Sequence, residues 1–546
     1  MNQFIKTIFV YIFLAGFCLA QTHRDWSYNL GMYEVNMRQY TEEGTFEAFS
    51  AHLDRLQEMG VGMLWFMPIH PIGEQNRLGS LGSYYSVRNY LEVNPNYGTL
   101  DDFKSLVREI HDRGMYVILD WVANHTAWDN VLTTTHPEWY ATDSQGNFIP
   151  PPGTNWSDVI ELDYSQQGLR DYMIDAMKFW VEEGGIDGFR FDAVSFVPDD
   201  FWREAIDELT AAKPDIFLLA EGDGGKWHNM GFHMTFGWSL YGFGGGVLKR
   251  IVDDESTALS LRSFAANERS TYGADAYRLY FTANHDENSW HGTTAELFGD
   301  AAAVCAVLIA TLPGMPLVYS GQESGLDKRL AFFDKDAIDW GDYENKEFYT
   351  SLLQLKKDNQ ALWNGDRGGD LQYLSTSNRT DVFAFIRENA GDRLMVAANL
   401  SAQPQTITLD GEAYVGLYQN VFTEQSVTLT ADAEMQLPAW GYGVFEGESD
   451  TGVLDEAMPS GFKLEPNVPN PFNAATTIAY SLDSTAEIFL GIYDIRGRKI
   501  ESLVSGPQPA GRHTVSFDAS ELSSGLYFYR LETATSHITK RLLVLR

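Results

Sequence analysis

Ionisable side chains recur at the ends of apolar runs in the first half of the chain. The stretch "GFRFDAV" (188–194) places Arg190 and Asp192 two residues apart in an otherwise apolar strand candidate. Such side chains leave the same face of a strand, and a buried charge is costly unless it is paired or has a function. Three similar runs carry further candidates, which are Asp120, Asn124 and His125 in "DWVANH", Glu221 in "LLAEG", and His285 and Asp286 in "FTANHD". Structural ion pairs could explain one or two of these groups, but their shared placement predicts one site.

This set of side chains suits the hydrolysis of a glycosidic bond. That reaction needs an ionised carboxylate and a protonated carboxylic acid beside the bond that is cleaved. Arg190 should keep Asp192 ionised and oriented, as a nucleophile requires. Glu221 ends an apolar run, so desolvation and neighbouring carboxylates should raise its pKa, as a general acid requires. No Cys–His spacing typical of a metal site accompanies these residues.

The elements that must position these residues alternate between strand and helix from about residue 27 to about 355. Most strand candidates are continuous apolar runs, as in parallel strands that are covered on both faces. The clearest helix, "TLDDFKSLVREIHDRG", has Thr99 as its cap and Gly114 as its stop. The pattern predicts a (β/α)8 TIM barrel over residues 21–365, with an inserted loop subdomain at about 125–160 after the third strand. A doubly wound open sheet is the alternative, but no glycine-rich dinucleotide motif follows the first strand.

The remainder of the chain reads as β-structure. Short alternating strands over residues 366–447 predict a β-sandwich, a polar stretch at 448–461 predicts a linker, and residues 462–546 predict a second β-sandwich.

The N-terminus and the composition bound the location and the partners. Residues 1–20 contain Lys6, an apolar core and Cys18-Leu19-Ala20, which is typical of a signal peptide; a retained membrane anchor is the alternative. No other segment is expected to span a bilayer. Cys305 lies in an apolar helix and is expected to be inert. The net charge of −36 repels phosphate backbones, which argues against nucleic acid as a partner, and it suits a neutral substrate.

The four charged runs together resemble the four sequence blocks of the α-amylase superfamily, glycoside hydrolase family 13. The resemblance covers about residues 27 to 447. It implies that Asp192 is the nucleophile of a covalent glycosyl-enzyme intermediate, that Glu221 is the acid and then the base, and that Asp286 is the third carboxylate. It further implies substrate-binding or supporting roles for Tyr85, Asp120, His125, Arg190 and His285.

Two positions depart from the family pattern. Many α-amylases carry a Lys-His pair that helps to bind calcium and a sugar, where this chain has Ser195 and Phe196. Asn124 and Asp163 resemble two calcium ligands of the family, so calcium is a possible cofactor. In the alternative, these two side chains only hold the inserted loop by hydrogen bonds. No organic cofactor is expected.

The C-terminal segment resembles the sorting domain of the type IX secretion system. The stretches "PNVPNPFNAATTIAYSL", "IYDIRGRKI" and "SSGLYFYRLET" carry the likeness. It implies that the secretion machinery is a partner and that the protein is secreted or held at the cell surface. A carbohydrate-binding β-module is the alternative.

The sequence therefore predicts a secreted, retaining hydrolase that cleaves α-1,4-glucosidic bonds of starch-like glucans and maltooligosaccharides. A cyclodextrin- or pullulan-degrading or maltogenic amylase, or a transglycosylase, would use the same residues. A non-catalytic sugar-binding protein is a distant alternative, because all three carboxylates are present.

Overall fold

The computed structural model describes two compact units, one within Met1–Asp450 and one within Thr451–Arg546. The first is described over residues 24–241, 246–431 and 433–448, and the second over 462–464, 467, 469–470, 472–482, 485–494, 498–520, 522–533 and 537–544. The predicted signal peptide and residues 449–461 of the predicted linker lie outside these ranges.

Eight parallel strands close into a barrel in the first unit. The first strand pairs with both the second and the last, through Met32–Met63 and Met32–Leu317. The strands are β1 (Met32–Val35), β2 (Met63–Phe66), β3 (Tyr116–Trp121), β6 (Gly188–Phe191), β7 (Phe217–Ala220), β8 (Met234–Phe236), β9 (Tyr277–Tyr280) and β10 (Met315–Tyr319). The predicted TIM barrel is confirmed.

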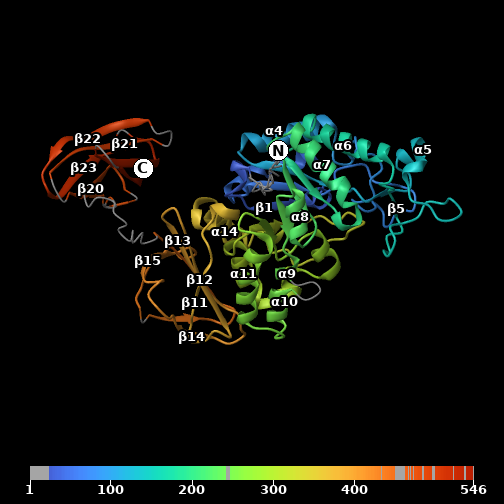
Figure 1. Ribbon diagram of the computed structural model, residues 1–546. Coiled ribbons are helices and arrows are strands. Elements are labelled where there is room, and N and C mark those ends of the chain that lie inside the picture. The colour runs from blue at the N-terminus through green and yellow to red at the C-terminus, as the bar shows by residue number, and fades with distance from the viewer. Residues whose placement is uncertain are drawn as a thin grey trace, which may run out of the picture. The chain divides into compact units, whose positions relative to one another are not determined.

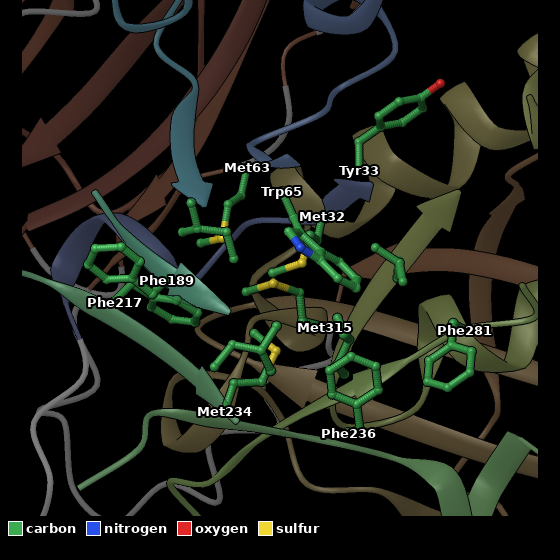
Figure 2. Packing of buried hydrophobic residues seen from close by; sticks show 14 of the residues in the cluster. Met32, Tyr33, Met63, Trp65, Phe189, Phe217, Met234, Phe236, Phe281 and Met315 are labelled. Carbon is green, nitrogen blue, oxygen red and sulfur yellow. The ribbon is translucent and has the colours of Figure 1, made fainter. Parts of the chain in front are cut away.

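Apolar side chains fill the barrel and cover its strands. Seven of the eight strands are buried along their whole length, and β3 is buried except at its first residue, Tyr116. Met32, Met63, Met234 and Met315 converge from four strands inside the barrel (Figure 2). Flexible methionines fill irregular gaps well, so the interior is a packed core rather than a channel.

Helices surround the barrel (Figure 1). Helix α4 (Leu100–Asp112) begins with the predicted cap, because Thr99 and Asp102 form a reciprocal capping box, and Gly114 follows its end with φ +72°. The other long helices are α6 (Gln167–Glu182), α7 (Asp199–Ala212), α11 (Ala258–Tyr272), α13 (Ala302–Thr311) and α14 (Lys346–Asp358). The shorter ones are α1 (Met37–Tyr40), α2 (Phe46–Ser50), α3 (Leu53–Glu58), α5 (Leu132–Thr135), α8 (Gly225–Met230), α9 (Trp238–Tyr241), α10 (Val247–Val252) and α12 (Thr294–Phe298).

One buried helical stretch is as long and as apolar as a membrane-spanning helix. In the described part of the chain, Thr294–Thr311 is long and apolar enough to span a bilayer by length and composition alone. More than half of it is buried inside the protein, and it carries the fully buried Cys305. A core helix can have the length and composition of a membrane helix, since both need apolar side chains on every face.

The insertion after β3 contains a small antiparallel ribbon. Strands β4 (His125–Ala127) and β5 (Val159–Glu161) pair through His125 and Glu161, and α5 lies between them in sequence. The ribbon begins four residues after the end of β3, so it can place the loop beside the carboxyl end of that strand.

Two β-domains follow the barrel in sequence, as predicted. In the first unit, a sheet in the order β11-β12-β13-β18-β15-β16 accompanies the pair β14-β17. In the second unit, the sheets are β19-β20-β23 and β22-β21-β24-β25. The strands of the β-domain in the first unit are β11 (Gln372–Leu374), β12 (Val382–Asn389), β13 (Asp392–Asn399), β14 (Gln405–Thr408), β15 (Gly416–Asn420), β16 (Ser426–Leu429), β17 (Glu434–Leu437) and β18 (Tyr442–Glu448). Those of the second are β19 (Phe462–Leu464), β20 (Ala475–Leu482), β21 (Ala486–Tyr493), β22 (Lys499–Gln508), β23 (Gly511–Asp518), β24 (Gly525–Glu532) and β25 (His537–Val544).

Candidate active site

One buried arginine joins three carboxylates at the barrel end where the strands finish. Arg190, on β6, donates from Nη1 to Asp120 Oδ1 at 2.8 Å and to Asp192 Oδ1 at 2.9 Å. Its Nη2 atom lies 3.0 Å from Glu221 Oε2. Strand register explains the convergence, because Asp120 on β3 lies directly opposite Arg190 and Glu221 follows the last residue of β7.

A strained turn links the two candidate catalytic carboxylates. Ala193, directly after Asp192, has φ +46° and ψ +45°, which is unusual for a residue with a Cβ. Its N–H donates to Glu221 Oε2 at 2.6 Å. Strained backbone of this kind concentrates at functional sites, where the surrounding structure holds it in place. Here the turn ties the residue after Asp192 to the Glu221 carboxylate.

Burial dominates the acidity of these groups. It raises the pKa of Asp192 to about 6, although Arg190 acts in the opposite direction. It raises the pKa of Glu221 to about 7, again against Arg190 and with Asp192 and Asp286 adding to the rise. Burial also raises the pKa of Asp120 to about 6. Between about pH 6 and pH 7, Asp192 is largely ionised while Glu221 still carries a proton, so the pair can supply a nucleophile and an acid together.

A second set of hydrogen bonds surrounds His285. The Tyr85 hydroxyl lies 2.7 Å from His285 Nε2 and donates to Asp120 Oδ2 at 3.0 Å. His285 Nδ1 lies 2.5 Å from Glu34 Oε1, and its Nε2 lies 3.4 Å from Asp286 Oδ2. Burial lowers the pKa of His285, but Asp286 and Glu34 outweigh it and raise the pKa to about 9. The imidazole is therefore cationic at neutral pH.

His125, at the start of the inserted ribbon, adjoins that cluster through a hydrogen bond with the Tyr85 backbone. Its ring centroid is 5.3 Å from that of Trp156 in the same insertion. Burial lowers the pKa of His125 to about 4, so the ring is neutral and can donate or accept one hydrogen bond at each nitrogen. The structure thus brings Tyr85, Asp120, Arg190, Asp192, Glu221, His285 and Asp286 into one network and places His125 on the adjoining insertion.

Asn124 and Asp163, the two residues that resemble calcium ligands, both take part in hydrogen bonds that hold the inserted loop. Asp163 Oδ1 accepts from Ser165 N at 3.0 Å, and Asp163 Oδ2 accepts from Gln166 Nε2 at 3.1 Å. The backbone oxygen of Asn124 accepts from Leu162 N at 3.1 Å. Within the described ranges, no three His, Cys, Asp or Glu side chains gather at one place, but calcium also takes Asn and backbone oxygens, which lie outside that set. Calcium binding stays a prediction from the resemblance alone.

Two buried residues of the site were missed in the sequence. Glu34, on β1, is fully buried beside His285, and the Trp65 indole on β2 donates to Asp120 Oδ2 at 3.2 Å. A signal for Glu34 existed, because it is a lone acid in the apolar run "GMYEVN". Its partner lies 251 residues away, however, and no local spacing joins the two.

Three family models match the chain. The α-amylase catalytic domain matches residues 24–158 and 153–367, the C-terminal domain of maltogenic amylase matches 371–444, and the secretion system C-terminal sorting domain matches 468–545. The first of these covers more than half of the chain and includes every residue of the network around Arg190.

Curated and solved relatives agree with these models. Alpha-amylase 3 of Dictyoglomus thermophilum is 24% identical over 75% of this chain and 93% of its own length. A maltogenic α-amylase, AmyB, from Thermotoga neapolitana has a TM-score of 0.69 and 28% identity, with 77% of this chain and 99% of that one covered. An α-amylase from Lactobacillus plantarum has a TM-score of 0.67 and 29% identity over 77% of this chain and 99% of its own. With its closed barrel and its carboxylates grouped on one arginine, the chain belongs to the α-amylase family and is a glycoside hydrolase.

Proposed function

We propose that the protein is a retaining hydrolase of α-1,4-glucosidic bonds in starch-like glucans and maltooligosaccharides. In this mechanism, Asp192 attacks the anomeric carbon while Glu221 protonates the departing oxygen, and Glu221 then deprotonates the water that releases the sugar. The observation that supports it best is that Asp192 and Glu221 both bind the Arg190 guanidinium. Carboxylates that share one guanidinium lie close together, which favours the separation of about 5–5.5 Å in retaining enzymes over the longer one in inverting enzymes.

The other residues of the network would position the sugar. Asp286 is the most exposed of the carboxylates, with 37% of its side chain accessible, so it can reach sugar hydroxyls. The cationic His285 beside it would donate to a hydroxyl or stabilise negative charge on Asp286. Tyr85 would present its ring to the sugar, while Asp120 and Arg190 fix the orientation of Asp192.

The proposal can be tested by the anomeric configuration of the product and by the effect of two substitutions on kcat. Glu221→Gln and Asp192→Asn should each lower kcat on amylose by about 10²–10⁴-fold, since each removes one proton-transfer or covalent step. Early wild-type product, followed by proton NMR, should be the α-anomer. Glu74→Gln, an equivalent change at an exposed site, should leave kcat unaltered. Early β-anomer would contradict retention, and unchanged rates in both variants would contradict the assigned roles.

A second substrate preference is favoured by the relatives. The relatives include a maltogenic α-amylase, cyclomaltodextrinases and a neopullulanase. In addition, residues 371–444 match the C-terminal domain of maltogenic amylase. Cyclodextrin or pullulan cleaved much faster than amylose would move the assignment to that class without changing the roles of Asp192 and Glu221.

We also propose that the protein is exported by type IX secretion and acts outside the cell or at its surface. The match of residues 468–545 to a secretion sorting domain supports this, and the predicted signal peptide agrees with it.

A further inference from the structure

A row of aromatic rings leads from the candidate site to the protein surface. The Tyr85 ring stacks beside His285 with centroids 5.4 Å apart, and it lies 6.2 Å from Phe332 with only 9° between the ring planes. Phe332 in turn lies 5.1 Å from Trp290, at 43°. Burial falls along the row, because Tyr85 is 8% exposed and Trp290 is 49% exposed.

The outer part of this row is held in place by hydrogen bonds. Trp290 lies in a single π-helical turn, Glu287–His291, directly after Asp286. Asn288 accepts from Leu330 N at 2.9 Å and donates to Lys328 O at 3.1 Å, and Ser289 donates to Leu330 O at 2.9 Å. These bonds fix the turn against the loop that carries Phe332.

Phe333 closes the outer end of the row. Its ring centroid lies 5.7 Å from that of Trp290 and 5.2 Å from that of Phe332, and its backbone oxygen accepts from Leu81 N at 2.9 Å. The rings are thus positioned before any ligand arrives, which reduces the entropy lost on binding.

We propose that Trp290, supported by Phe332 and Phe333, is a stacking platform for glucose units of the bound glucan that are remote from the cleaved bond. The inference rests on the proposed function. The C–H face of a glucose ring is apolar, and an exposed indole offers it a large, rigid and neutral surface. Trp290 is exposed and continues into the partly exposed rings of Phe332 and Phe333, and a contiguous apolar surface beside a site of this kind is typical of a ligand-binding groove.

Hydrogen bonds assign the platform to one side of the bond. Tyr85, the inner end of the row, donates to Asp120, and Asp120 shares Arg190 Nη1 with Asp192, whereas Glu221 lies at Arg190 Nη2. The sugar that leaves takes its proton from Glu221, and the sugar that stays is bound to Asp192. The row therefore continues from the Asp192 side, so the platform holds sugars on the non-reducing side of the bond.

The first experiment maps the bond that is cleaved in maltohexaose labelled at its reducing end. Trp290→Ala removes the contact that favours complexes with several units on the non-reducing side. Cleavage should shift toward the non-reducing end, so that the labelled products become longer. Trp290→Phe should restore most of the wild-type pattern, and Leu417→Ala, at another exposed apolar residue, should leave it unaltered.

The second experiment measures binding without turnover. In the Glu221→Gln background, calorimetric titration with maltohexaose should show about 5- to 10-fold weaker binding when Trp290 is also replaced by alanine, the loss expected for one stacked aromatic contact. Maltose should lose less, because it is too short to fill both the cleavage position and the platform.

The outcomes separate the inference from the function on which it rests. Unchanged binding and unchanged products in Trp290→Ala would overturn the platform, and shorter labelled products would place it on the leaving side and overturn its assignment. If the wild-type chain does not cleave maltohexaose and the Glu221→Gln variant does not bind it, the proposed function fails and the platform fails with it.

Discussion

Arg190 determines how close the acidic groups of the site can come to one another. Its side chain is almost fully buried, with Asp120 and Asp192 on one nitrogen and Glu221 on the other. A planar guanidinium offers several donors in a fixed arrangement, whereas a lysine ammonium would act as a single mobile charge. Without it, three buried carboxylates would face one another unpaired, which is costly enough to change their protonation or their positions.

The pH dependence of kcat/KM on a neutral glucan should be bell-shaped, with its maximum between about pH 6 and pH 7. Asp192 must be ionised, and its pKa is raised to about 6, so the rate should fall as the pH drops below that value. Glu221 must be protonated, and its pKa is raised to about 7, so the rate should fall as the pH rises above it. A profile that is level from pH 5 to pH 9 would contradict this assignment of acid and base.

At this scale the sequence predicts the identity of the groups better than their electrostatics. Arg190 and Asp192 stand out because two charges interrupt one apolar strand, and Glu221 stands out because it ends another. Spacing alone could not show that burial outweighs Arg190 in setting the pKa of Asp192, because that balance depends on which side chains of distant strands exclude water. Glu34 was missed for a similar reason, since its partner His285 becomes a neighbour only when the barrel closes.

Close contact between β6 and β7 brings the nucleophile candidate near the acid candidate. Gly188 starts β6 opposite Phe217, the first residue of β7. A Cβ at Gly188 would lie 1.9 Å from the Phe217 carbonyl oxygen, a backbone atom that cannot move without displacing β7. The absence of a side chain at this position therefore sets the spacing of the two strands that carry Asp192 and Glu221.

Gly188→Ala should destabilise the barrel by about 3 kcal/mol or more, since the added methyl meets fixed backbone. The midpoint of thermal unfolding should fall, and amylose hydrolysis should fall with it at temperatures where the protein stays folded. Gly146→Ala is the matched control: its φ is +83° but nothing lies within 4 Å of the added Cβ, so only backbone strain of about 1 kcal/mol is expected. Equal effects at the two positions would show that β6 and β7 can separate at little cost.

Apolar runs and capping residues predict the elements of the barrel. The run at β8, "GFHMTFGW", is the weakest of the eight, and the start of α4 follows from the Thr99 cap. Strands β11, β15, β16, β17 and β22 have no comparable apolar run in the sequence. They expose much of their length, so few apolar residues mark them, and their pairing depends on partners elsewhere in the sheets.

The whole molecule consists of a catalytic unit and a C-terminal unit with separate apolar cores. The second core is built from residues such as Leu490, Tyr529 and Leu542, and it contains no residue of the site. The likeness to a sorting domain lies wholly in this unit, at residues 468–545. Hydrolysis and export are therefore assigned to different parts of the chain.

A chain that ends at residue 450 should hydrolyse amylose with the kcat of the full-length protein but should stay inside the producing cell envelope. Activity assays on purified protein and cell fractionation of a producing strain would check the two halves of this prediction. Full-length Glu221→Gln is the matched control, because it should be exported normally and be inactive. Loss of activity on truncation would show that the C-terminal unit supports the barrel, and normal export would remove the sorting role.

The pairing of β1 with β10 makes the site depend on nearly the whole length of the barrel sequence. Glu34, near the beginning, holds His285, and Ser320, just past the last barrel strand, donates to the backbone oxygen of Glu34. A nascent chain from which residue 319 has not yet emerged would contain Asp192, Glu221 and Asp286, but its barrel would not be closed. Catalytic competence therefore arrives late in biosynthesis, and proteolytic fragments that lack either end of the barrel should be inert.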